Sequence, residues 1–177
     1  MTASRKTVRI LGIDPGTIAC GYGVVEVSGP VAFNRPRYIE CGVIELNARR
    51  GLPERLFALA RDLREILDEF EPQEVALEAA FHGKNAQSAL RLGHARGVIM
   101  MLAAEAELPL FEYAPAKVKR SVAGNGRAQK DEVQRNVTAL CRLSQTPRTD
   151  AADALAIAIC HAQHRLVRQL EPQLRVE

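Results

Sequence analysis

Residues 8–17 have the sequence VRILGIDPGT. The largely apolar run Val8–Ile13 has the length and composition of a buried β-strand, and the turn sequence DPGT follows it from Asp14. Two further runs, Gly21–Val27 and Arg37–Leu46, have the same character. We predict three strands that form an antiparallel meander.

Helices and strands alternate in the rest of the chain. Apolar residues recur every 3.6 positions between Leu52 and Phe70 and predict an amphipathic helix. The remaining predicted elements are strands at Val75–Glu78 and Pro109–Tyr113 and helices at Lys84–Glu107, Pro115–Val122, Lys130–Leu143 and Asp150–Leu170. Crossovers through the helices make the first, fourth and fifth strands parallel and place the first near the centre. We therefore predict an α/β fold, a five-stranded mixed sheet flanked by helices on both faces.

Length and composition fit a folded protein with its own core. The chain has 177 residues, of which 47% are hydrophobic and 25% charged, and this excludes intrinsic disorder and collagen-like architecture. Its longest unbroken apolar stretch, Val98–Ala104, is too short to span a membrane, and Met1–Val8 lacks the apolar core of a secretory signal. We predict a cytoplasmic protein without membrane contact, with a single domain over residues 1–170 and a flexible tail over 171–177.

The cysteines do not indicate a zinc or redox site. They are Cys20, Cys41, Cys141 and Cys160, without the paired spacing of either kind of site, and are predicted to be buried thiols. Cys160, His161 and His164 are close together on one predicted helix, but a closed zinc site needs a fourth ligand and none is evident.

Positive charge is concentrated in one segment. The net charge is only +3, yet residues 115–148 hold eight Lys or Arg against two acids, around the sequence GNG at 124–126. A loop that follows nucleic-acid phosphates explains this pattern. A solvated helix face explains it equally well, and both interpretations remain open.

Four carboxylates occur at the edges of apolar elements. Asp14 ends the first strand, Glu78 ends the fourth, and Asp150 and Asp153 share one side of the last helix at its start. Parallel neighbouring strands would bring Asp14 and Glu78 together at the carboxyl ends of the sheet, where open α/β sheets bind ligands. Carboxylates so close need a cation, and hard oxygen ligands suit Mg²⁺ or Mn²⁺. Two such ions can activate water and stabilise the leaving oxygen in phosphodiester hydrolysis.

Each acid also has a structural interpretation. Asp14 before Pro15 is typical of a turn, and Glu78 would serve as an exposed strand end. Asp150 and Asp153 have the spacing of a helix capping box, with the second acid at the N3 position. One acid at the edge of an apolar element is easily a coincidence, whereas four such acids in one chain are harder to explain by chance.

Several motifs together resemble the RuvC family, the bacterial Holliday-junction resolvases. The acidic motifs are GIDPGT at 12–17, EAAF at 78–81 and DAADALAIA at 150–158. Further similarity lies in the predicted helix around LGHARG at 92–97, in FEY at 111–113 and in residues 118–128. The likeness extends from about Arg9 to His161.

The resemblance implies a ribonuclease H-like fold and a homodimer that binds a four-way DNA junction and nicks two opposing strands symmetrically. Water would attack the phosphodiester directly, with two Mg²⁺ ions in each active site and Mn²⁺ as a substitute. The four acidic positions of the family fall on Asp14, Glu78, Asp150 and Asp153, which are therefore expected to be catalytic metal ligands. A RuvA–RuvB branch-migration complex is the expected partner.

The resemblance also implies DNA contacts. Phe81 matches an aromatic residue near the junction centre, and Lys119 and Lys130 match basic positions linked to binding and cleavage. Arg127 lies within a matching motif. Apart from the resemblance, Lys84 and Arg91 lie on the predicted central helix, and their positive charge makes them candidates for phosphate contacts. These six residues are the predicted DNA-binding set, although a solvated helix face explains Lys84 and Arg91 as well.

Small residues on the predicted central helix suggest a close helix contact. Ala89, Gly93 and Gly97 recur at a spacing of four. Packing within the chain would use such a seam, and so would a two-fold dimer, which places two active sites on symmetry-related strands.

Three other functions fit parts of the sequence. One is an actin-like or sugar-kinase-like ATPase, which needs two lobes where this chain has the length of one. The others are a non-catalytic module for branched nucleic acid and a ribonuclease H-like nuclease with another substrate.

Overall fold

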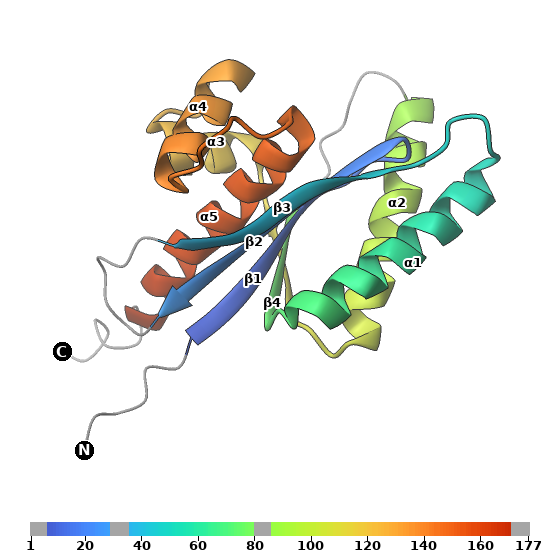
Figure 1. The fold of residues 1–177 in the computed structure, drawn as a ribbon, viewed down its shortest axis with the longest axis horizontal. Helices are drawn as coiled ribbons and strands as arrows, with labels where there is room; N and C mark the ends of the chain where they lie inside the picture. The colour runs from blue at the N-terminus through green and yellow to red at the C-terminus, as the bar shows by residue number, and fades with distance from the viewer. Residues whose placement is uncertain (1–6, 29–35, 80–85, 171–177) are drawn as a thin grey trace.

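The computed structural model describes residues 7–28, 36–79 and 86–170. Its strands are β1 (Thr7–Asp14), β2 (Ala19–Ser28), β3 (Arg37–Glu45), β4 (Glu74–Glu78) and β5 (Leu110–Tyr113). Its helices are α1 (Leu52–Phe70), α2 (Ala86–Glu105), α3 (Pro115–Ala123), α4 (Lys130–Leu140) and α5 (Thr149–Leu170). Each predicted element is present, in the predicted order (Figure 1).

The strands form one mixed sheet with the order β3-β2-β1-β4-β5. β1 pairs antiparallel with β2 and parallel with β4, and β4 pairs parallel with β5. The predicted meander and the central position of the first strand are therefore confirmed. The last β1–β4 pair is Ile13 with Leu77, so Asp14 and Glu78 follow it on adjacent parallel strands.

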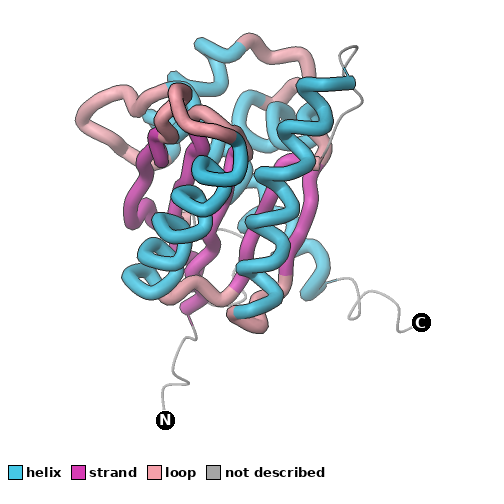
Figure 2. Tube along the Cα trace, turned by 90° about the vertical axis from the view of Figure 1, so that its right-hand side faces the viewer, coloured by secondary structure: helices cyan, strands magenta, loops and turns pink. Residues whose placement is uncertain are grey.

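Helices cover both faces of the sheet. α1 and α2 lie together on one face, and α3, α4 and α5 lie on the other (Figure 1). Figure 2, turned by 90°, shows helices in front of the strands. Because side chains alternate along a strand, Ile10 of β1 packs into the core under α5, whereas Leu11 and Ile13 pack under α1 and α2. Two apolar layers thus enclose β1.

Glycines allow α5 to lie against the sheet backbone. A Cβ atom added to Gly12 would stand 2.3 Å from the carbonyl oxygen of Ala154, and one added to Gly21 would stand 2.0 Å from that of Asp150. At Gly23 the added atom would meet Leu155 at 2.8 Å. Since real Cβ atoms never approach backbone this closely, any larger residue at these positions would push α5 away.

Some predicted details differ from the structure. α4 ends at Leu140 instead of Leu143, and Arg142 beyond it has the left-handed φ of 54° that ends a helix. α5 begins at Thr149, so Asp150 lies inside its first turn and the capping-box interpretation, with Asp150 as N-cap, is wrong. Cys20, Cys141 and Cys160 are buried as predicted, but Cys41 is only partly buried.

Two further predictions concern the membrane and the ends of predicted segments. No helix among the described residues is long and apolar enough to cross a membrane. The predicted tail, 171–177, lies outside the described residues, as does the predicted helix start at Lys84.

The Gly12→Ala substitution should lower the free energy of unfolding by about 1–3 kcal/mol, because the new methyl group overlaps the backbone of α5. Urea denaturation at neutral pH measures the change. Thr146→Ala, at an exposed position in the loop before α5, is the control, since its side chain lies at the surface. Equal denaturation midpoints for Gly12→Ala and the wild type would show that α5 does not depend on this close approach.

Candidate active site

Three of the four predicted acids line one cavity at the carboxyl ends of the parallel strands. Asp14, Glu78 and Asp153 share this space, of about 150 Å³, with Lys119 and Lys130. Its remaining walls are Pro115, Val118, Val133, Ala156 and Ile157. The cavity therefore joins acids from β1, β4 and α5 to lysines from α3 and α4. We call it the acidic pocket.

The fourth acid stands beside this pocket. Asp150 is one helical turn before Asp153, and its backbone rests on Gly21 of β2, the residue paired with Asp14. Its charge contributes to the raised pKa values of Asp14 and Asp153. The structure thus brings together all four acids that the sequence singled out.

Burial and mutual repulsion make these carboxylates hard to ionise. The pKa of Asp14 rises to about 7, chiefly because the side chain is buried and then because of the negative charges of Asp153, Glu78 and Asp150. Burial also raises the pKa values of Glu78 and Asp153. Asp14 and Glu78 are both partly buried where their strands end, so ionisation of each carries a penalty that a fully exposed carboxylate would not have.

A lysine offsets part of this negative charge. Lys130 Nζ lies 3.5 Å from Asp153 Oδ2, although the Lys130 side chain is 71% exposed. Its charge lowers the pKa values of Asp14, Glu78 and Asp153 without cancelling the effect of burial. The pocket therefore still favours additional positive charge.

The donor set of the acidic pocket fits a hard divalent cation. In the side-chain arrangement of the described residues, no three His, Cys, Asp or Glu groups converge on one metal position. The four acids nevertheless supply only carboxylate oxygens, which Mg²⁺ and Mn²⁺ prefer, and after burial the neighbouring negative charges contribute to the raised pKa values of Asp14, Glu78 and Asp153. These residues are suited to hold such ions.

The predicted DNA-binding residues lie in different surroundings. Lys119 and Lys130 line the acidic pocket. Arg127 is exposed in the loop before α4, where its backbone N–H donates to Asn125 Oδ1 at 3.0 Å, and Arg91 is exposed on α2. Phe81 and Lys84 lie outside the described residues.

The sequence analysis missed a buried arginine next to the pocket. The guanidinium of Arg96, on α2, donates to the backbone carbonyl of Glu78 and pairs with Glu112 of β5. A hint exists in the sequence, since Arg96 adjoins Ala95 on the helix face that also buries Ile99. An arginine at such a position needs a buried acceptor.

The histidines on α5 have protein partners. His161 lies between Tyr113 and Glu74, with Nδ1 2.7 Å from the tyrosine hydroxyl and Nε2 2.6 Å from the carboxylate. His164 Nδ1 is 2.8 Å from the carbonyl oxygen of Cys160. These contacts give the cluster around Cys160 a structural role in the described part of the chain, as the sequence analysis preferred.

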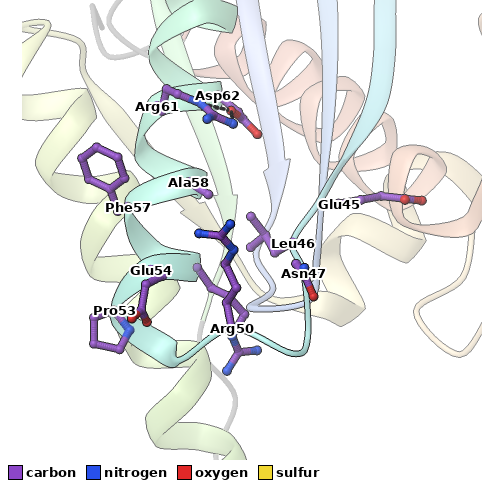
Figure 3. Close-up of a pocket in the computed structure, with 11 residues that line it drawn as sticks. Glu45, Leu46, Asn47, Arg50, Pro53, Glu54, Phe57, Ala58, Arg61 and Asp62 are labelled. Carbon is purple, nitrogen blue, oxygen red and sulfur yellow. Dashed lines mark hydrogen bonds and ion pairs between the residues drawn. The ribbon is translucent and has the colours of Figure 1, made fainter.

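A larger hollow, of about 690 Å³, lies between the β3–α1 connection and α1 (Figure 3). Its lining carries both signs of charge, including Arg50 and Glu54, and Arg61 pairs there with Asp62. None of the four acids lines it. Volume alone therefore does not single out a candidate site, and the acidic pocket differs from this hollow in lying where β1 and β4 end beside the start of α5.

Comparison with known proteins gives one consistent match. The family model described as crossover junction endodeoxyribonuclease RuvC matches residues 10–161. The RuvC protein of Halorhodospira halophila is 49% identical over 157 residues, which cover 89% of this chain and 91% of that protein. The protein of the same name from Bartonella henselae is 44% identical over 161 residues, covering 91% and 93%.

Solved structures agree with the sequence matches. Thermus thermophilus RuvC in complex with Holliday junction substrate is 34% identical and superposes with a TM-score of 0.83, covering 91% of this chain and 96% of that one. The yeast mitochondrial Holliday junction resolvase Ydc2 is 17% identical, with a TM-score of 0.61 over 98% of this chain and 89% of its own. The second likeness shows a shared fold.

Without divalent ions, protein stability should fall as the pH rises from about 4 to 7. The folded chain holds a proton on Asp14 up to a pKa of about 7, whereas the unfolded chain loses it near 3.8, so ionisation favours unfolding. Asp14→Asn should weaken this dependence, with Glu78 and Asp153 accounting for what remains, and should be more stable than the wild type at pH 8 by a few kcal/mol, on the order that the pKa shift allows.

Urea denaturation in EDTA across this pH range tests the prediction, with Asp68→Asn, an exposed acid on α1, as control. Addition of Mg²⁺ at pH 8 should stabilise the wild type more than Asp14→Asn. Parallel pH profiles for the wild type and Asp14→Asn would show that Asp14 ionises without a penalty.

Proposed function

The chain belongs to the RuvC family of crossover junction endodeoxyribonucleases, and on that premise we propose that it resolves four-way DNA junctions by nicking two opposing strands. The observation that supports this most directly is the acidic pocket, because four carboxylates from β1, β4 and α5 gather where the central parallel strands end. The α/β sheet beneath them is that of ribonuclease H-like resolvases.

The family is metal-dependent, and we assign the metal ligands to Asp14, Glu78, Asp150 and Asp153. Two Mg²⁺ ions are the proposed occupants, with Mn²⁺ as a substitute. Divalent cations in such a site lower the pKa of a water nucleophile and stabilise the negative charge on the leaving oxygen. The ends of β1 and β4 and the first turns of α5 fix where the backbones of these four acids stand, so the carboxylates are held in place for the ions they would bind.

Lysines complete the pocket on the side of α3 and α4. Lys130, near Asp153, and Lys119 bring positive charge to a space that would otherwise repel a phosphodiester. As negative charge develops on the phosphate, these ammonium groups stabilise it. Lys130 Nζ is free to turn towards a phosphate because most of its side chain is exposed.

Further DNA contacts extend beyond the pocket. Arg127 and Arg91 are exposed and offer guanidinium groups to phosphates. Lys84 adds a further positive charge, and the family resemblance adds Phe81 as an aromatic side chain that stacks on bases near the junction centre. Together with the two pocket lysines, these residues form the proposed DNA-binding set.

The outer face of α2 is the proposed homodimer interface. Nothing within the described residues lies within 4 Å of a Cβ added to Gly93 or Gly97, so the seam does not serve packing within the chain. Leu90 and Met101, at helical spacing from these glycines, are 63% and 50% exposed. Such an apolar stripe with small residues lets two α2 helices approach about a two-fold axis.

Association with a RuvA–RuvB branch-migration complex is proposed from the family resemblance. Such a partner would position the junction for cleavage.

Asp153→Asn should reduce junction nicking by about a thousandfold, which corresponds to a loss of ~4 kcal/mol of transition-state stabilisation. Junction affinity should change little, because the DNA-binding residues remain. The assay uses an end-labelled synthetic four-way junction beside linear duplex and RNA–DNA hybrid, each with Mg²⁺, Mn²⁺ or EDTA. Asp68→Asn on α1, on the opposite face of the sheet, should cleave like the wild type.

Paired symmetric nicks on the junction alone, lost in EDTA, support the proposed function. Tight junction binding without nicking under either metal would instead identify a recognition module. Preferential cleavage of the RNA–DNA hybrid would indicate a ribonuclease H-like nuclease with another substrate. More than a tenth of wild-type activity in Asp153→Asn would overturn the role of that residue.

Gly97→Leu should convert the dimer to a monomer while the chain stays folded, because the new side chain enters open space on α2. Sedimentation velocity measures the mass, and circular dichroism checks the fold. Ala139→Leu, at an exposed position on α4, is the matched control and should stay dimeric. An unchanged mass for Gly97→Leu would place the interface elsewhere.

A further inference from the structure

Arg96 is the charged residue of α2 that the structure buries. Its side chain is only 8% exposed, between the sheet and the helix. One terminal nitrogen of its guanidinium donates to the carbonyl oxygen of Glu78, and the other pairs with Glu112 Oε1. Taking a guanidinium out of water is costly unless its partners are well placed, so this arrangement fixes both partners.

Glu78 lies at the end of β4, where its backbone pairs with β5 but no longer with β1. The β1–β4 register ends at Ile13 and Leu77, so Glu78 lies one residue past the last pair with β1. On its other side it pairs with Tyr113 of β5, and Ala79 N–H donates to the carbonyl oxygen of Tyr113 at 2.8 Å. The hydrogen bond from Arg96 thus restrains the Glu78 backbone from a helix outside the sheet.

The same arginine adjoins the outer face of α2. Gly97 follows it directly, and Gly93 lies one turn before Gly97 on the face that carries no intrachain contact within 4 Å among the described residues. The Arg96 side chain itself is buried and contacts the end of β4. A shift of α2 along its axis would move the guanidinium and, with it, the carbonyl of Glu78.

We propose that Arg96 is a positioning residue: its hydrogen bond to the Glu78 carbonyl oxygen fixes the Glu78 backbone and thereby places the Glu78 carboxylate in the acidic pocket. The inference rests on the proposed function, because it concerns the metal-binding role given to Glu78. Arg96 acts through the main chain of β4 without touching the reacting phosphate, and Glu112 keeps the guanidinium in place.

Arg96→Met tests this inference, since methionine fills similar volume and removes every donor. We expect divalent-ion affinity, measured by Mn²⁺ titration calorimetry without DNA, to weaken by roughly 10- to 100-fold, as for other groups that orient metal ligands. The Mg²⁺ concentration for half-maximal nicking should rise in parallel. Junction affinity, measured by gel shift in EDTA, should stay unchanged.

Two further variants separate positioning from simple loss of structure. Arg96→Lys keeps one charged donor and should recover part of the Mn²⁺ affinity. Glu112→Gln keeps an acceptor for the guanidinium and leaves the Glu78 carbonyl contact, so it should bind Mn²⁺ almost like the wild type. Arg64→Met removes an exposed arginine that pairs with Glu105 between α1 and α2, and it controls for loss of charge at the surface.

The outcomes distinguish this inference from the proposed function. Wild-type Mn²⁺ affinity in a folded Arg96→Met would overturn the role of Arg96 and leave the nuclease function standing. The role of Arg96 is likewise overturned if Arg96→Lys binds Mn²⁺ no better than Arg96→Met. A wild-type protein that binds Mn²⁺ but nicks no junction would instead overturn the proposed function.

Discussion

The contact between α5 and the backbone of β1 and β2 is the constraint on which the acidic pocket depends. Gly12, Gly21 and Gly23 leave no room for a Cβ atom, and the helix occupies that space with its own main chain. Asp150 and Asp153 thereby stand beside the end of β1, although more than a hundred residues separate them from Asp14 in sequence. Strand pairing places Asp14 beside Glu78, and close packing of α5 on the sheet, without any attraction among the acids, adds Asp150 and Asp153.

Burial and mutual repulsion of the carboxylates in the acidic pocket oppose the packing that brings them together. Burial and the neighbouring acids raise the pKa of Asp14 to about 7, so the folded chain carries a group that prefers to be neutral. Strain of this kind is typical of functional sites, where the rest of the fold must supply the stability. Here the two apolar layers around β1 supply it, and the lysines of α3 and α4 relieve only part of the repulsion.

Sequence reasoning predicted what depends on local pattern and strand direction. Parallel pairing placed Asp14 beside Glu78, and a spacing of three put Asp150 and Asp153 on one side of a helix. It could not predict how closely α5 approaches the sheet, because Gly12 in a strand looks the same whether solvent or a helix faces it. Arg96 was missed for a related reason, since burial of an arginine depends on acceptors that only the folded chain supplies.

The long separation between the strand acids and those of α5 has a consequence for synthesis on the ribosome. The sheet and the helices up to α4 come from residues before Thr149, and this part of the chain contains only two of the four acids. Because a domain generally folds as a unit, a chain that still lacks α5 lacks part of the core on one face of the sheet as well as two acids. The proposed nicking activity therefore requires that α5 be made and docked.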